Sequence, residues 1–479
     1  MLKKTVLTAA LAAACAGPHA ATSTPSTPAA DPAANDRELA AIRAQIQEMK
    51  ASYEARLASL EQRLQEAQAA VAQAQNAAAA VQTADTAPPA AAAAPAAPAV
   101  AATGANAFNP AISLVLGGTL SNLSKDPGDY RFQGFVPPEG EVGPGARSFN
   151  LGESEMTISS NIDPNFAGQA TFAITGENEI EVEEAYIRTR ALGNGLNVKA
   201  GRFMSGIGYL NSQHAHTWDF VDAPFAYQAF FGGQYKPDGI QGRWLAPLDT
   251  FLEFGLEAAS GRNFPGNDRN KNGVGASTVF AHAGGDIGVS SSWRAGLSYL
   301  RTRASERGLA APGDDDAIPA AFSGRSQVVI ADAVWKWAPD GNATQRNFKL
   351  QGEWMQRRER GSLAVMDEQG GYRSRQSGWY LQGVYQFAPN WRTGLRYDRL
   401  SSGTPRIDLV DGGIPGAAGL ASLAAYDPRR TSLMVDYSPS EFSRLRLQIA
   451  RDKSRPEASD QQLYLQYIMS IGAHAAHNF

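Results

Sequence analysis

The 479-residue sequence holds one cysteine, six histidines and no strong excess of charge of either sign. The formal net charge is −4, with 43 Lys and Arg against 47 Asp and Glu, which gives no strong field for nucleic acid or an acidic surface. After the first twenty positions no run of about 18 apolar residues occurs, so no helix is predicted to span a bilayer. Any membrane crossing must therefore use strands, which cross lipid only as closed barrels.

Residues 1–20 have the layout of an export signal. Two lysines precede a short apolar segment, and small residues follow, with Ala14-Cys15-Ala16 as a candidate peptidase site. Cleavage after Ala16 would remove the single cysteine, so the mature chain would hold neither a disulfide nor a cysteine metal site. Residues 11–15 can also be interpreted as a poor lipoprotein box, and both interpretations export the protein.

Residues 36–75 are predicted to form one helix with a single apolar seam. Leu39, Ile42 and Ile46 begin a series of alternating spacings of three and four, as in a coiled coil. Such a helix cannot bury its seam alone, so self-association is expected, and packing against another part of the chain is the alternative. Residues 76–107 are rich in Ala and Pro with almost no charge, which predicts a semi-rigid linker to the next domain.

Over residues 108–479 the hydrophobic pattern changes to a period of two, which is typical of strands with two unlike faces. Leu463 and Leu465 share one face, while Gln462 and Gln466 lie on the other. Charges on the second faces suit a water-filled lumen, whereas a packed core could not bury them unpaired. Aromatic residues gather at predicted strand ends, as an interfacial girdle requires: Trp335, Trp337, Trp379, Phe387, Trp391 and Tyr437.

Short turns containing Pro, Gly or Asn alternate with longer loops along this region. The long loops are predicted at roughly 122–150, 204–236, 261–275, 303–323, 359–373 and 402–428. This alternation predicts a closed antiparallel barrel of about 16 strands, with both barrel ends on the short-turn, periplasmic side. We therefore expect an all-β transmembrane barrel in the bacterial outer membrane, preceded by a periplasmic coiled coil.

A barrel of this size encloses an aqueous lumen unless something fills it. The loop over 204–236 is the main candidate for a partial constriction. Charged residues on the inferred inward faces are predicted to line the pore: Arg243, Glu253, Glu257, Arg294, Glu353, Arg392, Arg396, Asp436, Arg444 and Arg446. The later strands lean basic, which favours anionic solutes locally. The alternative is that these charges merely neutralise one another across the pore.

The most distinctive chemical cluster is the stretch 213–222. If it is extended, His214 and His216 project on the same side, and with Asp219 and Asp222 they could coordinate a divalent ion such as zinc. The alternative is a loop folded into the pore and held there by hydrogen bonds. Zinc is the one cofactor considered, and none is required. No Ser/His/Asn constellation stands out, so we predict no enzymatic activity.

The C-terminal Phe479 ends an alternating strand and resembles the signal recognised by barrel-assembly machinery. The stretches 109–114, 201–222 and 472–474 resemble an uncharacterised proteobacterial outer-membrane family whose members are often labelled zinc-regulated TonB-dependent receptors. More distantly, the region from Gly201 resembles phosphate-selective and coiled-coil-bearing trimeric porins. The receptor label implies a plug and about 22 strands, more than this chain can supply. The residues therefore favour a porin, and the resemblance adds a link to zinc supply.

Three functions follow from these patterns. The first is an outer-membrane porin that lets small hydrophilic solutes diffuse. The second is a receptor or channel for zinc or a zinc complex, and the third is a structural envelope anchor whose coiled coil reaches toward peptidoglycan. The expected partners are two further copies in a homotrimer held by coiled coil and barrel, outer-membrane lipid and the barrel-assembly machinery, but not nucleic acid.

Overall fold

The protein is described from a computed structural model over residues 110–138, 142–176, 179–309, 319–366, 368–408 and 420–472. The chain divides into two compact units, Met1–Ala101 and Ala102–Phe479, and the described residues belong to the second. The predicted export signal, coiled coil, linker and terminal Phe479 lie outside the described residues and stay predictions. No helix within the described residues is long and apolar enough to cross a membrane.

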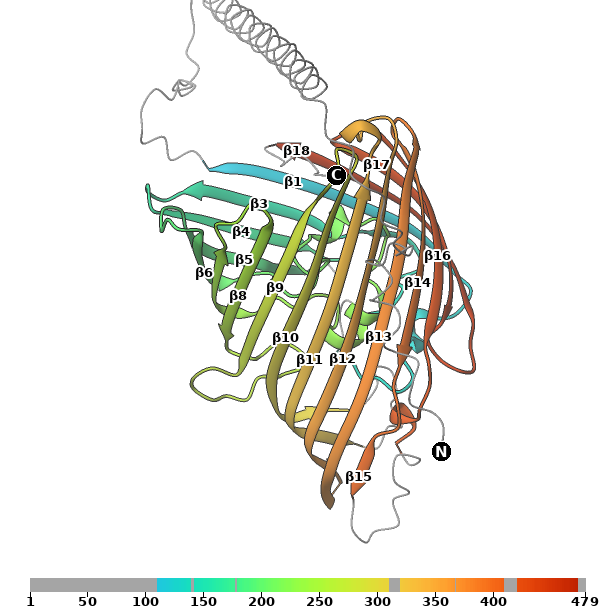
Figure 1. Ribbon diagram of the computed structural model, residues 1–479. Coiled ribbons are helices and arrows are strands. Elements are labelled where there is room, and N and C mark those ends of the chain that lie inside the picture. The colour runs from blue at the N-terminus through green and yellow to red at the C-terminus, as the bar shows by residue number, and fades with distance from the viewer. Residues whose placement is uncertain are drawn as a thin grey trace, which may run out of the picture. The chain divides into compact units, whose positions relative to one another are not determined.

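One antiparallel sheet forms the wall of this unit (Figure 1). Its strands are β1 (Ala111–Leu123), β2 (Ser148–Leu151), β3 (Ser154–Asn161), β4 (Phe166–Ile174), β5 (Ile180–Thr189), β6 (Leu196–Arg202), β7 (Asp238–Leu245), β8 (Phe251–Ala259), β9 (Ala276–Ile287), β10 (Ser291–Gly308), β11 (Ala320–Trp337), β12 (Asn347–Val365), β13 (Glu368–Ala388), β14 (Trp391–Ser401), β15 (Arg406–Asp408), β16 (Arg429–Ser440), β17 (Ser443–Lys453) and β18 (Asp460–Gly472). The short helices are η1 (Pro127–Asp129), η2 (Ala215–Thr217), α2 (Phe225–Phe231), η3 (Pro339–Gly341) and η4 (Ala421–Leu423).

The sheet closes on itself. Each long strand pairs with its sequence neighbours, and β18 returns to pair with β1 from Ser113 opposite Gly472 to Leu123 opposite Gln462. Of the 18 strands, the short β2 and β15 only extend the wall beside β1 and β13, which leaves sixteen in the ring. The predicted closed antiparallel barrel of about 16 strands is confirmed. Closure matters because it leaves no strand edge unpaired in lipid.

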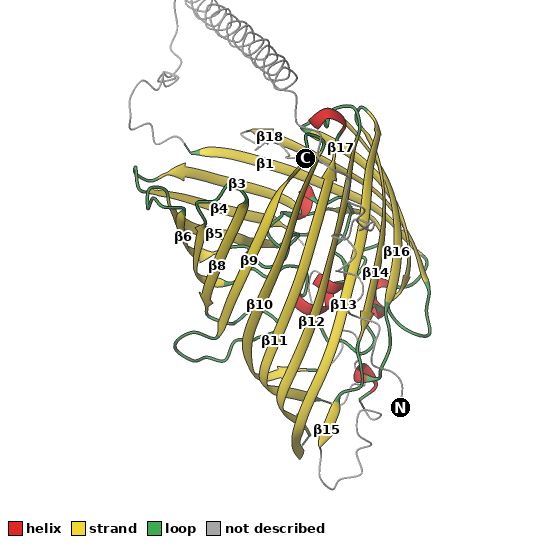
Figure 2. Cartoon of the chain, viewed as in Figure 1, coloured by secondary structure: helices red, strands yellow, loops and turns green. Residues whose placement is uncertain are grey.

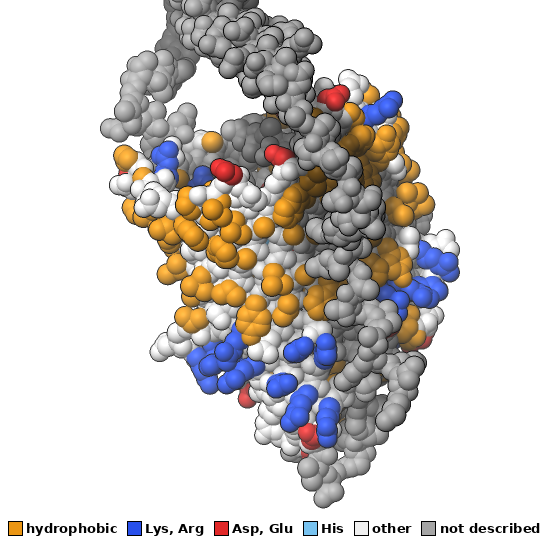
Figure 3. All heavy atoms as spheres, in the orientation of Figure 1, with side chains coloured by type: hydrophobic (Ala, Val, Ile, Leu, Met, Phe, Trp, Pro, Cys, Tyr) orange, Lys and Arg blue, Asp and Glu red, His pale blue; other side chains and the backbone are white. Residues whose placement is uncertain are grey.

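The barrel wall is apolar outside and polar inside, which reverses the pattern of a soluble protein. On β17, Leu447 and Ile449 are each 49% exposed, whereas Arg446 and Gln448 are 1% and 0% exposed. Figure 3 shows the apolar side chains as a band across the barrel surface. A transmembrane barrel requires this arrangement, because its outer face meets lipid and its inner face meets water or other polar groups.

Aromatic rings lie at two levels of this band. At the short-turn end, the rings of Trp391 and Tyr437 lie 4.7 Å apart between centroids. Farther toward the long-loop end, Trp379 lies 5.5 Å from Tyr397 and pairs across the strands with Trp354. Trp and Tyr concentrate at membrane–water interfaces because their rings have an apolar body and a polar edge. The two levels therefore mark the two edges of the membrane-facing band.

The predicted long loop at 359–373 is wrong. Strands β12 and β13 continue through it and remain paired as far as Val365 opposite Glu368. The alternation persists, since Val365 and Tyr372 turn inward into an apolar cluster with Phe322. The outer face of this stretch carries arginines instead of apolar residues, and that change of chemistry misled the loop prediction.

Candidate pore constriction

Residues 203–236, which connect β6 to β7, form the candidate constriction and are called the lumen segment below. They contain η2 and α2, which Figure 2 shows among the strands of the barrel. Helix α2 starts after Pro224 and ends at Gly232, whose left-handed conformation (φ 72°) stops the helix. All seven residues of α2 are buried. The prediction that the loop over 204–236 enters the lumen is confirmed.

An apolar patch inside the barrel receives the helix. Phe225, Tyr227 and Phe230 are fully buried in one cluster with side chains from the inner faces of β10 to β14, namely Leu300, Val328, Ile330, Met355 and Leu400. From the opposite side the ring of Phe132, in the loop after β1, meets that of Phe225 at 4.7 Å. The lumen of a membrane barrel is usually polar, so these inward apolar residues fix where the helix packs.

Asp219 is the first of two carboxylates that tie the lumen segment to a basic wall. Its oxygens lie 2.6 Å from Lys349 Nζ and 3.4 Å from Arg392 Nη1, and they accept a hydrogen bond from Gln382 Nε2 at 2.9 Å. Burial by itself would raise the pKa of Asp219, but the charges of Lys349 and Arg392 lower it to about 2. The carboxylate is therefore ionised at neutral pH.

Asp222 makes the second tie, to two arginines on β14 and β16. It lies 2.7 Å from Arg396 Nη2 and is also paired with Arg430, and both guanidinium groups are almost fully buried. Burial opposes ionisation of Asp222, yet these two arginines lower its pKa. Asp398 supports the pair, since its oxygen lies 3.1 Å from Arg396 Nε and 3.4 Å from Arg430 Nε.

Backbone carbonyls of the lumen segment bind the same wall. Arg446 donates to the Trp218 carbonyl oxygen at 2.7 Å, and Arg444 donates to that of His216. Gln448 accepts from the Val221 amide at 2.8 Å. Strands β14, β16 and β17 thus present a row of basic and polar groups to one side of the segment.

Glutamates on other strands hold the opposite side. Glu257 on β8 accepts from Ser205 Oγ at 2.6 Å and from the Gly206 amide at 2.9 Å. Glu353 on β12 accepts from the Leu210 amide at 2.9 Å and from the Tyr227 hydroxyl at 2.8 Å. The lumen segment is therefore anchored to strands around the ring, which makes it a crossing of the lumen and not a flap on one wall.

The two histidines of the segment face acidic residues of β3 and β5. His214 Nδ1 lies 2.9 Å from Glu155 and 3.2 Å from Glu183, while its Nε2 lies 3.3 Å from Glu184. His216 Nδ1 lies 2.7 Å from Glu155. Burial would lower the pKa of His214, but its hydrogen bonds with the three glutamates raise the pKa well above the ordinary value.

The structure separates the four predicted zinc ligands into two groups. His214 and His216 lie together, with ring centroids 5.7 Å apart, whereas Asp219 and Asp222 are committed to the basic wall. The carboxylates nearest the imidazoles come instead from β3 and β5. One donor atom each from Glu155, Glu183 and His214 lie within 4.8 Å of one another, a group that could hold a metal ion.

The ten charged residues predicted to line the pore all lie on inward faces, with different degrees of cover. Arg243 and Glu253 face each other at 3.3 Å and are partly exposed. Arg294 lies over the ring of Tyr209 in the lumen segment, 5.2 Å from its centroid. Others are covered by the segment and are at most 3% exposed, namely Glu257, Glu353, Arg396, Asp436 and Arg446. The remaining two, Arg392 and Arg444, contact the segment through Asp219 and His216.

Several anchoring residues were missed at the level of sequence. Glu155, Glu183 and Glu184 bind the histidines, and Asp398 with Arg430 completes the arginine pairs. Their period-two placement on strands was a usable signal for inward orientation. It could not say which wall each strand joins, because that depends on closure of the ring.

Comparisons with known proteins give one sequence relative and several structural ones. The chain is 30% identical over 402 residues to an uncharacterized protein of Aquifex aeolicus, covering 78% of this chain and 80% of that one. No family model matches. The outer-membrane channel DcaP of Acinetobacter baumannii aligns with TM-score 0.48 and 11% identity over 76% of this chain and 97% of that chain. An anion-selective porin from Comamonas acidovorans aligns with TM-score 0.46 and 10% identity, over 76% and 99% respectively.

Proposed function

Because this chain belongs to one family with the Aquifex aeolicus protein and closes into a sixteen-stranded barrel, we propose that it is an outer-membrane porin. Small hydrophilic solutes would diffuse through the lumen past the lumen segment. The observation that carries this proposal is a polar, charged barrel interior crossed by one anchored segment. A barrel serving only as an anchor would gain nothing from buried charge pairs, which are costly to desolvate.

A preference for anions is part of the proposal. Lys336 on β11 lies directly opposite Lys349 on β12, and both face the lumen near the short-turn end. Arg294 and Arg392, also partly exposed, lie on inward faces of β10 and β14. Clustered cations along an aqueous path raise the local concentration of anions. Asp219 and Asp436 offset part of this charge, so we expect a preference and not strict selectivity.

Single-channel recording in planar bilayers tests the porin proposal. The refolded full-length protein should give stable steps, and its zero-current potential in a tenfold KCl gradient should have the sign of anion preference. Absence of conductance from protein that shows the heat-modifiable migration of a folded barrel would refute it and favour a structural anchor.

Zinc binding is a second candidate, favoured by the donor atoms of Glu155, Glu183 and His214. One imidazole and two carboxylates fit zinc, which takes nitrogen and oxygen ligands. Lys236 lies 3.0 Å from Oε1 of Glu183, whereas His214 faces Oε2 of the same carboxylate, so an ion beside His214 would share Glu183 with this lysine. Calorimetric titration of the protein with zinc tests this candidate. Saturable binding should be lost in His214→Ala and kept in His282→Ala, a matched lumen histidine that lies beside Glu253.

Assembly and location complete the proposal. We propose a homotrimer in the outer membrane, with the predicted coiled coil at 36–75 in the periplasm joining the protomers. The apolar band of the barrel supports a membrane location. Chemical crosslinking and mass measurement in detergent test the trimer, and removal of residues 21–107 tests whether the coiled coil is responsible. Monomers alone for the full-length protein would remove the trimer from the proposal.

A further inference from the structure

The outer face of the barrel carries a row of arginines that face one another across consecutive strands. Arg303 on β10 lies opposite Arg325 on β11, which lies opposite Arg360 on β12, which in turn lies opposite Arg373 on β13. All four are exposed. They are called the arginine row below. Because inward and outward residues alternate, this row lies outside the lumen and has no part in the constriction.

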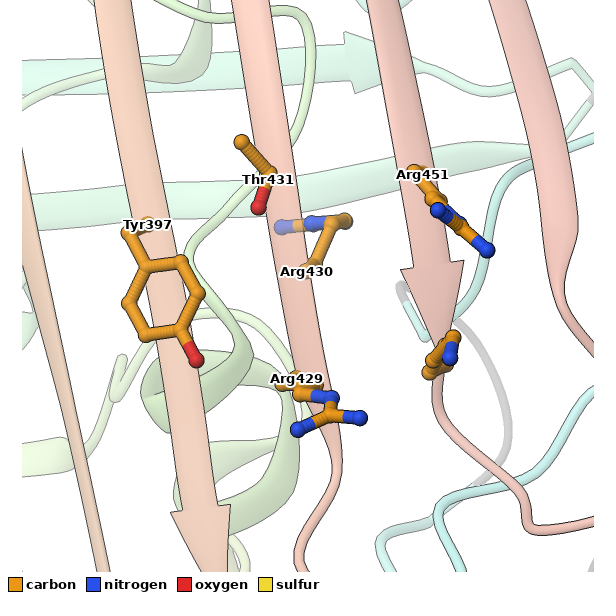
Figure 4. A pocket seen from close by; sticks show the side chains of 6 residues that line it. Tyr397, Arg429, Arg430, Thr431 and Arg451 are labelled. Atoms are coloured by element: carbon orange, nitrogen blue, oxygen red, sulfur yellow. The ribbon is translucent and has the colours of Figure 1, made fainter.

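A second basic group lies farther round the ring, on β14, β16 and β17. Arg399 is opposite Arg429, and Arg429 is opposite Lys453. Arg429, Arg451 and Lys453 line a pocket of about 310 Å³ together with Tyr397 and Thr431. Arg430 also lines it, but this side chain is buried and paired with Asp222 and Asp398. Figure 4 shows the side chains of Tyr397, Arg429 and Arg451 on the neighbouring strands that form it. This set is called the basic pocket below.

Pairing of cations directly opposite one another on neighbouring strands is unfavourable unless nearby anions compensate the positive charge. Like charges directly opposite on antiparallel strands destabilise the pair. Among the described residues, no acidic side chain pairs with the arginine row, and in the basic pocket's register only Arg399 has an acidic partner, the half-exposed Asp427 at 3.0 Å. A sheet face with repeated facing cations and so few acids is therefore expected to bind anions from its surroundings.

The heights of the two groups on the barrel identify those surroundings. The basic pocket lies near the level of the aromatic pair, since Arg399 is directly opposite Trp379. The row lies farther toward the long loops than the aromatic pair Trp354 and Trp379. On β12, Arg360 is six residues after Trp354, and on β13, Arg373 is six residues before Trp379. A strand rises roughly 3.3 Å per residue and tilts by about 40° in a membrane barrel, so six residues correspond to about 15 Å along the membrane normal. The headgroup region adds only about 5–8 Å on each side of the hydrocarbon core, so the row lies at the outer edge of the headgroups, within reach of a phosphorylated sugar that projects beyond them. Figure 3 shows Lys and Arg side chains gathered just beyond the apolar band.

We propose that the arginine row and the basic pocket bind the phosphates of a phosphorylated glycolipid in the membrane leaflet next to the long loops. Guanidinium groups bind phosphate through two parallel hydrogen bonds. Tyr397 adds a ring at the edge of the apolar band, where a sugar headgroup and an acyl chain would meet. The proposal rests on the membrane-spanning barrel of the proposed function but not on conduction, so the two can fail separately.

The test measures lipid retention by native mass spectrometry, with bis-phosphorylated lipid A added to the full-length protein in detergent. The row variant is Arg325→Gln with Arg360→Gln and Arg373→Gln. The matched control removes the same charge from exposed residues of β5 and of turns at the short-turn end, through Arg188→Gln, Arg190→Gln and Arg346→Gln. Each arginine near an anionic lipid surface contributes to the free energy of lipid binding. We therefore expect the row variant to lose roughly tenfold or more of its apparent affinity for lipid A.

Several outcomes would overturn the proposal. Equal retention by the row variant and the control would show that the row does not bind lipid. Equal retention of dephosphorylated lipid A would show that phosphate is not recognised, and displacement by millimolar inorganic phosphate would point to free phosphate instead. A changed oligomeric state in the row variant would identify this face as a contact between copies. Unchanged heat-modifiable migration and conductance of the row variant would show that it folds and that conduction is separate.

Discussion

Replacing Asp222 by Asn removes one carboxylate charge from the tie between lumen segment and basic wall. Breaking a buried ion pair by removing one partner costs about 3–5 kcal/mol, because the other charge stays buried. Here the loss falls at the low end, about 3 kcal/mol, since Asp398 still lies within 3.4 Å of both Arg396 and Arg430. A change of about 3 kcal/mol shifts the ratio of docked to undocked segment by roughly 150-fold.

Single-channel recording detects that shift, since an undocked segment leaves the lumen wider. Asp222→Asn should show frequent transitions to a larger conductance that are rare in the wild type. Asp427→Asn is the matched control, because the same chemical change there removes a half-exposed pair with Arg399, worth at most about 1 kcal/mol. If Asp222→Asn and Asp427→Asn gave the same records, the lumen segment would not be held by this pair.

Three further predictions concern the same region. The pKa of Asp219 is lowered from 3.8 to about 2, so its stabilisation of the docked segment is complete above about pH 5 and is lost as the pH falls through 3.8 toward 2. Conductance fluctuations recorded at decreasing pH will detect this loss. Lys336→Gln together with Lys349→Gln should move the zero-current potential in a salt gradient toward cation preference, while Arg325→Gln, on the outer face of β11 toward the long loops, should not. Phe230→Ala should lower the stability of the docked segment by about 3–5 kcal/mol, seen as cleavage of the segment by added protease.

The sequence predicted the barrel because its two determinants are local. Alternation such as that of Leu463 and Gln462 fixes which face of a strand meets lipid, and turn chemistry fixes where strands end. The loop error at 359–373 has the same origin, since outward arginines above the membrane edge resemble loop residues when only composition is considered. Strand β12 runs through that stretch because its inner face stays apolar at Val365.

Partners across the lumen could not be predicted in the same way. Glu155 and His214 are 59 positions apart by their numbers, and their meeting depends on ring closure and on the path of the lumen segment. The apolar patch that contacts α2 is indicated in the sequence by the run Val328-Val329-Ile330, in which both faces of β11 are apolar. Such a break in alternation within a membrane strand predicts an apolar object in the lumen, although it does not identify that object.

The charges of the lumen segment explain its orientation across the barrel. Its histidines come before its aspartates in the sequence, so a stretch of nine residues is basic at one end and acidic at the other. The barrel wall carries the opposite charge at each end of this stretch, with Glu155 beside His214 and Arg396 beside Asp222. A segment docked the other way round would bring like charges together at both walls. Charge pairing of the His-Ala-His and Asp-Phe-Val-Asp motifs with the barrel wall therefore favours one direction of the lumen segment across the barrel, whether or not the histidine end also binds metal.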